Sequence, residues 1–179
     1  MFRRGFSLSE LIIVCSIISI MTVVALVSIN GTNRFSKEVE SAAREVAVAI
    51  REAQNNALGG KQPDYNSKII ACGHGFYFAN NGDSNYKIFY NPKTETDCST
   101  AKKNYDAAAS RNYVSYSLPN GIKFSAGKGA IYFDSPHGNV YRDGSLLTSV
   151  LTITITKNFQ SYNICVYPSG NVLESKNPC

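Results

Sequence analysis

The sequence predicts an α+β fold, in which a long N-terminal helix packs on an antiparallel β-sheet domain. Three observations lead to this prediction. The chain opens with an apolar run, continues with a stretch of helical periodicity, and then alternates short β-prone segments with glycine turns. Its 179 residues suffice for one membrane segment and one modest globular domain.

Residues 6–30 make up the apolar run and are expected to form a membrane helix. The uncharged stretch Leu11–Ile29, with the residues just before it, reaches the ~20 residues that cross about 30 Å of hydrocarbon. Arg3 and Arg4 precede the run, so the leader is expected in the cytoplasm and the rest of the chain outside. Glu10 lies just inside the amino end, where an ionised carboxylate needs a partner.

Three interpretations of residues 1–30 fit this pattern. In the first, the segment is a plain membrane anchor whose Glu10 side chain reaches the headgroups. In the second, it is a secretory signal with a cleavage site at Val23–Ala25, although an acid so early in the apolar region argues against this. In the third, a cut after Gly5 leaves Phe6 with a free amine, and an amine close to the Glu10 carboxylate is the partner that a buried acid requires.

The residues from Arg3 to Val14, Arg-Arg-Gly-Phe-Ser-Leu-Ser-Glu-Leu-Ile-Ile-Val, resemble the class III signal of type IV pilins and pseudopilins. The resemblance implies that prepilin peptidase cuts after Gly5 and methylates the new N-terminal Phe6. It also implies that Glu10 neutralises the terminal amine of a neighbouring subunit in the filament. Residues 1–5 are then a cytoplasmic leader peptide, and residues 6–30 the helix of the filament core.

Residues 31–58 are expected to be the amphipathic half of the same helix, which in the resemblance is the pilin spine helix. Charged side chains occupy the other faces of this segment, and Gly59-Gly60 is a typical helix stop. The apolar residues that recur every three or four positions, and that we expect to be buried, are Phe35, Val39, Ala42, Val46, Ile50, Ala53 and Ala57.

Residues 59–179 are expected to form a β-rich extracytoplasmic domain. Turn signals such as Pro119-Asn120-Gly121 separate most of its candidate strands. The polar region 80–112 resembles no segment of a known family, and we expect much of it to form loops on the outer face. The candidate strands are Lys68–Ala71, Gly75–Ala79, Tyr86–Tyr90, Tyr113–Leu118, Ile122–Ser125, Ala130–Phe133, Asn139–Arg142, Leu151–Thr156, Tyr162–Tyr167 and Asn171–Leu173.

A narrower resemblance covers the end of the chain. The segments Ala130–Val140, Leu151–Thr156 and Tyr162–Val172 are similar to the closing strands of GspH/FimT-type minor pilins and pseudopilins. This likeness implies a minor subunit and a final hairpin built on a glycine turn.

Nucleic acid is a doubtful partner. Some FimT-type proteins bind DNA through a Gly-Arg-Val-Arg-like segment in the last hairpin, but the matching Gly170–Leu173 lacks both arginines. Lys102, Lys103 and Lys176 remain as candidate phosphate contacts. The net charge of +5 falls by two, to +3, when Arg3 and Arg4 leave with the leader, and so weak an excess does not by itself indicate nucleic acid.

The five cysteines follow the predicted topology. Cys15 lies in the membrane run and is expected to act as a small apolar residue. The other four face an oxidising exterior, where disulfides persist, and they allow three pairings. We favour Cys72–Cys98, which encloses the polar central region, and Cys165–Cys179, which ties the tail to a late strand.

The sequence gives no sign of catalysis or of a cofactor. Cys72-Gly-His74 with Cys98 does not have a common zinc-ligand spacing, so no metal is expected. His74 and His137 both stand beside glycine, where surface histidines in turns are expected. There is no catalytic triad order, paired-acid motif or phosphate loop, so the chain is not expected to be an enzyme.

The resemblance thus implies a structural subunit of a type IV pilus or type II secretion pseudopilus, and the narrower resemblance implies a minor one. Its implied partners are other pilin or pseudopilin subunits, prepilin peptidase/methyltransferase, a membrane assembly platform, and membrane lipid before assembly. It would cross the inner or cytoplasmic membrane once and then enter an extracytoplasmic filament. Two other classes stay open, a DNA-binding minor pilin of a competence pilus and a plain anchored extracytoplasmic domain.

Overall fold

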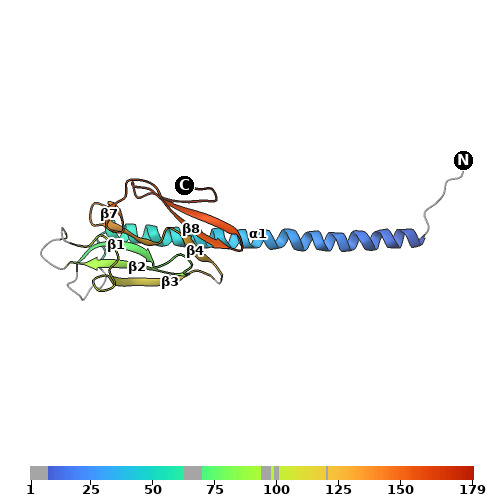
Figure 1. The fold of residues 1–179 in the computed structure, drawn as a ribbon, viewed down its shortest axis with the longest axis horizontal. Coiled ribbons are helices and arrows are strands. Elements are labelled where there is room, and N and C mark those ends of the chain that lie inside the picture. The colour runs from blue at the N-terminus through green and yellow to red at the C-terminus, as the bar shows by residue number, and fades with distance from the viewer. Residues whose placement is uncertain (1–7, 63–69, 94–97, 99–100, 120) are drawn as a thin grey trace. The chain divides into compact units, whose positions relative to one another are not determined.

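The computed structural model describes residues 8–62, 70–93, 98, 101–119 and 121–179. A helix, α1 (Leu8–Leu58), is followed in the described residues by ten strands. The chain divides into two compact units, Met1–Lys37 and Glu38–Cys179. The second unit therefore includes the later half of α1 together with all the strands (Figure 1). This is the α+β arrangement that the sequence predicts.

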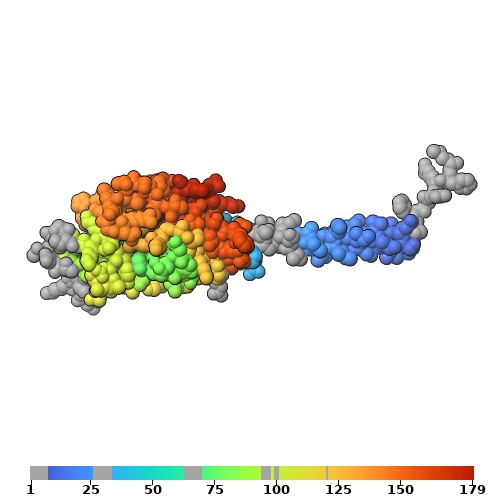
Figure 2. Space-filling view, viewed as in Figure 1, coloured from blue at the N-terminus to red at the C-terminus, as the bar shows by residue number. Residues whose placement is uncertain are grey.

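The strands form two antiparallel sheets. The six-stranded sheet has the order β3-β2-β1-β5-β6-β7, and the four-stranded sheet has the order β10-β9-β8-β4. In Figure 2 the C-terminal strands, orange to red, gather on one side of the Glu38–Cys179 unit, and β1–β3, green to yellow, on the other. The strands are β1 (Ala71–Phe78), β2 (Asn85–Pro92), β3 (Arg111–Ser117), β4 (Lys123–Ala126), β5 (Gly129–Asp134), β6 (Val140–Arg142), β7 (Ser145–Leu146), β8 (Leu151–Lys157), β9 (Gln160–Val166) and β10 (Val172–Ser175).

The main core lies between the later half of α1 and both sheets. Every member of the predicted apolar stripe from Val39 to Ala57 is buried, whereas Phe35, in the other unit, is half-buried. Six of the buried helix residues are alanines, whose small side chains let the strands approach the helix backbone. The large side chains that fill the core come from the strands and include Phe76, Phe78, Phe124, Phe133, Ile153 and Ile164.

The helix ends as the sequence predicts. Lys61 N donates to Asn56 O at 2.9 Å, and Gly60 N donates to Ala57 O at 3.2 Å. Gly60 has a φ of 57°, so the two bonds form a Schellman motif with glycine in the left-handed position that it tolerates best. This motif stops α1 at Leu58 and turns the chain away from the helix axis.

The prediction of a break between the strands Lys68–Ala71 and Gly75–Ala79 was wrong. A single strand, β1, runs from Ala71 to Phe78, so Cys72-Gly-His74 lies inside the sheet. Residues 68 and 69 are outside the described residues. Two glycines permit this continuity, because a Cβ at Gly73 would collide with Phe133 O, and one at Gly75 would lie 2.6 Å from Ile131 O. Glycine here marks close backbone approach to β5, not a turn.

One short strand was not predicted. β7 has only two residues and pairs with β6 through Tyr141 and Leu146. The Asp143-Gly144 turn signal between β6 and β7 is present in the sequence, but a two-residue strand is too short to show a hydrophobic period.

Two disulfides close the second unit. Cys72 in β1 is bonded to Cys98 with a Cα–Cα distance of 5.4 Å, and Cys165 in β9 is bonded to Cys179 with a Cα–Cα distance of 5.7 Å. These are the two pairings favoured from the sequence. Each restricts the unfolded chain, which contributes about 2–4 kcal/mol to stability.

We expect Gly75→Ala to destabilise the Glu38–Cys179 unit by about 2 kcal/mol or more. The new methyl group would meet both the Phe89 ring and the β5 backbone, and a backbone atom cannot move aside as a side chain can. Thermal unfolding of the full chain in detergent, followed by circular dichroism, measures the change. The control Ser115→Ala on the exposed face of β3 should stay within about 0.5 kcal/mol. Equal stability of the two variants would contradict the packing account.

Candidate functional site

The first part of α1 presents an unusually apolar surface. Leu8–Ala25 has a mean hydropathy of 2.3, is long enough to cross a membrane, and has no residue buried within the described structure. Soluble surfaces rarely expose a continuous apolar area of this extent, so it indicates contact with lipid or with other helices. Its most exposed large side chains are Leu8, Leu11, Ile13, Ile18, Ile20, Met21, Val23 and Val24.

Polar side chains within this surface are satisfied by the helix itself. The hydroxyls of Ser16, Ser19 and Thr22 donate to the carbonyls four residues earlier, at 2.7, 2.8 and 2.7 Å. These bonds remove the need for water or for a polar partner. The hydroxyl groups are therefore compatible with hydrocarbon around the helix.

Glu10 is the charged residue of this surface. It lies in the first turn of α1 as described, and its side chain is exposed. No other charged residue occurs in Leu8–Ala25. Gly5 and Phe6 lie outside the described residues, so the cut between them and the pairing of Glu10 with a terminal amine stay predictions.

His74 is not the surface residue that the sequence suggested. It lies within β1, is 1% exposed, and packs near the rings of Tyr90 and Tyr113 at centroid distances of 6.2 and 6.1 Å. Neither ring nitrogen has a hydrogen-bond partner among the described residues. Burial, with a smaller contribution from the charge of Lys61, lowers the pKa of His74 to about 4. The imidazole is therefore neutral at pH 7.

His137 follows the prediction. It lies in the turn between β5 and β6 and is exposed. The two histidines differ because β1 continues through Cys72-Gly-His74, whereas the chain turns after Asp134. A glycine neighbour alone does not distinguish a turn from a closely packed strand.

The face of the six-stranded sheet opposite the main core carries an aromatic cluster. Phe89, Ala130 and Tyr132 are buried there, and Tyr77, Tyr105 and Tyr141 are partly buried against them. The rings of Tyr77 and Tyr105 stack at 4.1 Å. Lys87 Nζ donates to Tyr105 OH at 3.1 Å, and Lys103 Nζ donates to Tyr141 OH at 2.7 Å. These lysines thus help to hold the cluster together.

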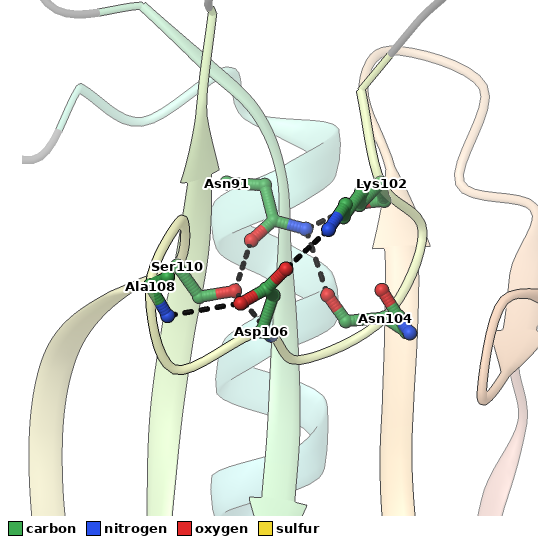
Figure 3. A network of polar contacts seen from close by, with 6 residues as sticks. All are labelled: Asn91, Lys102, Asn104, Asp106, Ala108 and Ser110. Carbon is green, nitrogen blue, oxygen red and sulfur yellow. Dashed lines mark hydrogen bonds and ion pairs between the residues drawn. The ribbon is translucent and has the colours of Figure 1, made fainter.

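The loop before β3 is tied to β2 by a polar network (Figure 3). Buried Asn91 donates from Nδ2 to the carbonyls of Lys102 and Asn104, and accepts from Ser110 Oγ at 2.6 Å. Asp106 accepts from Ala108 N at 2.9 Å and pairs with Lys102. The polar composition of 80–112 therefore serves in part to order a loop, and Asn91 itself lies in a strand.

The last hairpin packs on α1. Arg51 Nη2 donates to Val172 O at 2.6 Å and pairs with Glu174 Oε1 at 2.9 Å. A Cβ at Gly170 would collide with the Gln54 side chain, so the turn lies directly against the helix. The segment matched to the DNA-binding hairpin therefore contributes to packing, and Lys102 and Lys103 already have partners in Asp106 and Tyr141.

Comparison with known proteins identifies the N-terminal segment. Residues 1–26 match the family model described as the prokaryotic N-terminal methylation motif. The match supports a type IV pilin-like class III signal peptide at the position predicted from the sequence. Comparisons with curated proteins and with solved structures gave no match. The narrower likeness to GspH/FimT-type subunits stays a prediction.

The buried His74 predicts a loss of stability in acid. The unfolded chain binds a proton near the ordinary pKa of 6.5 and the folded chain only near 4, so stability should fall as pH drops from about 6.5 to about 4. A pKa difference of this size corresponds to a change of about 3 kcal/mol in the free energy of unfolding. Urea unfolding of the full chain in detergent, repeated across this range, measures the fall.

The variants His74→Leu and His137→Leu separate this effect from the titration of carboxylates. His74→Leu should flatten the pH dependence between about 6.5 and 4, and His137→Leu, an exposed matched change, should leave it intact. The same slope in His74→Leu as in the parent chain would show that His74 is not the group responsible.

Proposed function

We propose that the protein is a structural, non-catalytic subunit of a type IV pilus or a type II secretion pseudopilus. The observation that carries this proposal is the methylation motif at residues 1–26, which overlaps an exposed apolar helix and precedes a folded, disulfide-bonded domain. Such a precursor is a pilin-type substrate of prepilin peptidase that assembles with other pilins.

In the proposed assembly, removal of residues 1–5 frees the amine of Phe6. The Leu8–Ala25 surface then exchanges lipid for the helices of neighbouring subunits. Lipid and leucine are equally apolar, so close packing and polar pairing must favour the exchange. A Glu10 carboxylate that meets the terminal amine of a neighbour provides such a pairing and selects one axial register.

The charge of the leader supports the orientation that we propose. Arg3 and Arg4 keep the amino end in the cytoplasm, so the Glu38–Cys179 unit lies outside before and after assembly. Two disulfides in that unit agree with an oxidising compartment.

A minor position in the filament is supported by the closing strands. The segments that resemble GspH/FimT-type subunits form β5, β8 and the β9–β10 hairpin, whose turn is packed on α1 by Gly170 and Arg51. The DNA-binding alternative is weaker, because the hairpin lacks the two arginines and Lys102 and Lys103 are engaged within the domain.

The processing step can be tested directly. Membrane-extracted protein from cells with active prepilin peptidase should begin at Phe6 and carry one N-terminal methyl group. Cells with an inactivated peptidase should yield the chain with residues 1–5 intact. Intact mass and N-terminal sequencing measure both. A cut at any other bond, or none with active peptidase, would remove the basis of the proposal.

The assembly step is tested by Glu10→Ala. We expect membrane insertion to be unchanged. Recovery in sheared filaments should fall at least about tenfold, because the terminal amine of the neighbouring subunit loses its partner and an unpaired charge in low dielectric costs several kcal/mol. Immunoblots of membrane and filament fractions measure the two quantities. Ser9→Ala, next in the sequence, is the control and should assemble normally. Normal recovery of Glu10→Ala would contradict the pairing account.

A further inference from the structure

Phe159 stands out among the apolar residues of the second unit. It lies in the turn between β8 and β9 and is 106% exposed, as open to solvent as in an extended chain. Asn158 and Phe159 have φ angles of 46° and 64°, the left-handed conformation of a type I′ hairpin turn. Glycine is preferred at the second position of such a turn, and an aromatic residue there is strained. Because the Phe159 side chain is fully exposed, packing within the described domain does not explain a phenylalanine at this position.

The hairpin tip is at the end of the domain where the chain enters it. Lys157 Nζ lies 2.8 Å from Glu38 Oε2, and Glu38 is the first residue of the second unit. Lys157 pairs with Gln160 across the hairpin, so the turn projects directly from this contact. Lys123, in the neighbouring strand β4, pairs with Thr156 of β8 and is exposed beside the same tip.

The segment between the apolar run and the second unit is short. Eight residues, 30–37, separate Ile29, the last apolar residue of the N-terminal run, from Glu38. Eight residues rise about 12 Å as a helix. The headgroup layer adds roughly 5–8 Å to each side of the hydrocarbon. A tether of this length is short enough for a hairpin at the entry end of the domain to reach the headgroup layer.

We propose that the β8–β9 tip binds the phospholipid surface of the membrane that the chain's own helix spans. Phe159 would enter the boundary between headgroups and acyl chains, and the Lys123 ammonium would contact lipid phosphates. An aromatic side chain next to a lysine is the combination that interfacial membrane segments use, and anionic lipid strengthens it. The contact would hold the domain on the membrane before assembly. The inference rests on membrane insertion from the proposed function but not on filament formation.

The chain offers a clean reporter for this contact because it contains no tryptophan. Phe159→Trp places a single tryptophan at the tip. Leu146→Trp is the matched control, since Leu146 is 57% exposed in β7. β7 pairs with β6, which follows Gly138, and Gly138 lies against Leu58 at the far end of the helix from Glu38. Each full chain is reconstituted at low density in phosphatidylglycerol–phosphatidylcholine vesicles, with and without bromination of the upper acyl chains.

We expect Phe159→Trp to emit at shorter wavelength than Leu146→Trp and to lose emission in brominated vesicles, while Leu146→Trp keeps it. The quenching should weaken when phosphatidylcholine replaces the anionic lipid; equal quenching would overturn the role of Lys123. Vesicle flotation after an alkaline wash checks membrane insertion separately, so a failed insertion is not mistaken for an absent contact.

Two results would overturn the proposal. One is quenching of Phe159→Trp no greater than that of Leu146→Trp in fully inserted chains. The other is shielding of the Phe159→Trp side chain from water that appears only at high protein density and is not accompanied by bromine quenching. This result would mean that a neighbouring subunit covers the tip.

Discussion

Close approach between backbones is the constraint on which the folded domain depends. Alanines on the buried face of α1 let two sheets rest near the helix axis, and Gly73 and Gly75 let β1 lie tightly against β5. The phenylalanines and isoleucines that fill the remaining space come from the strands. Because the small residues set the spacing, added volume at these positions cannot be absorbed by rotation of a side chain.

The same helix meets two environments, and its side chains change accordingly. In Leu8–Ala25 apolar residues occur on every face and the hydroxyls bond back to the helix, whereas from Val39 onward one stripe is buried and the other faces carry charge. Two ionisable groups lie in unfavourable surroundings. Glu10 stands on an apolar surface, and His74 is enclosed by aromatic rings. For Glu10 we propose a partner outside the subunit, and His74 is accommodated by staying neutral.

Periodicity allowed the helix and most strands to be predicted. The stripe from Val39 to Ala57, the stop at Gly59-Gly60 and the alternating Leu151–Thr156 each repeat a simple spacing. The predicted exterior placement of four cysteines left three pairings, and the polar central region with the position of the tail favoured the two that the structure contains.

The remainder depends on contacts between residues distant in sequence. Glycine beside His74 looked like a turn because the neighbouring strand β5, which makes glycine necessary there, is almost sixty residues away. The order of the 101–110 loop likewise depends on Asn91, an amide whose three bonds have no local sequence signature. For the membrane segment the motif itself was informative. Gly5 and Phe6 lie outside the described residues, and the roles predicted for them involve an enzyme and a neighbouring subunit, which a single chain does not contain.

The Asn91 network also has a practical consequence for the outside of the domain. Bonds of Asn91, Asp106 and Ser110 order the loop, and residues 107–109, all alanine, are exposed on it. The loop is therefore ordered while its three alanines stay accessible to solvent. A foreign peptide grafted between these alanines would be carried on an ordered loop, and a filament of the kind that we propose would display it at regular intervals.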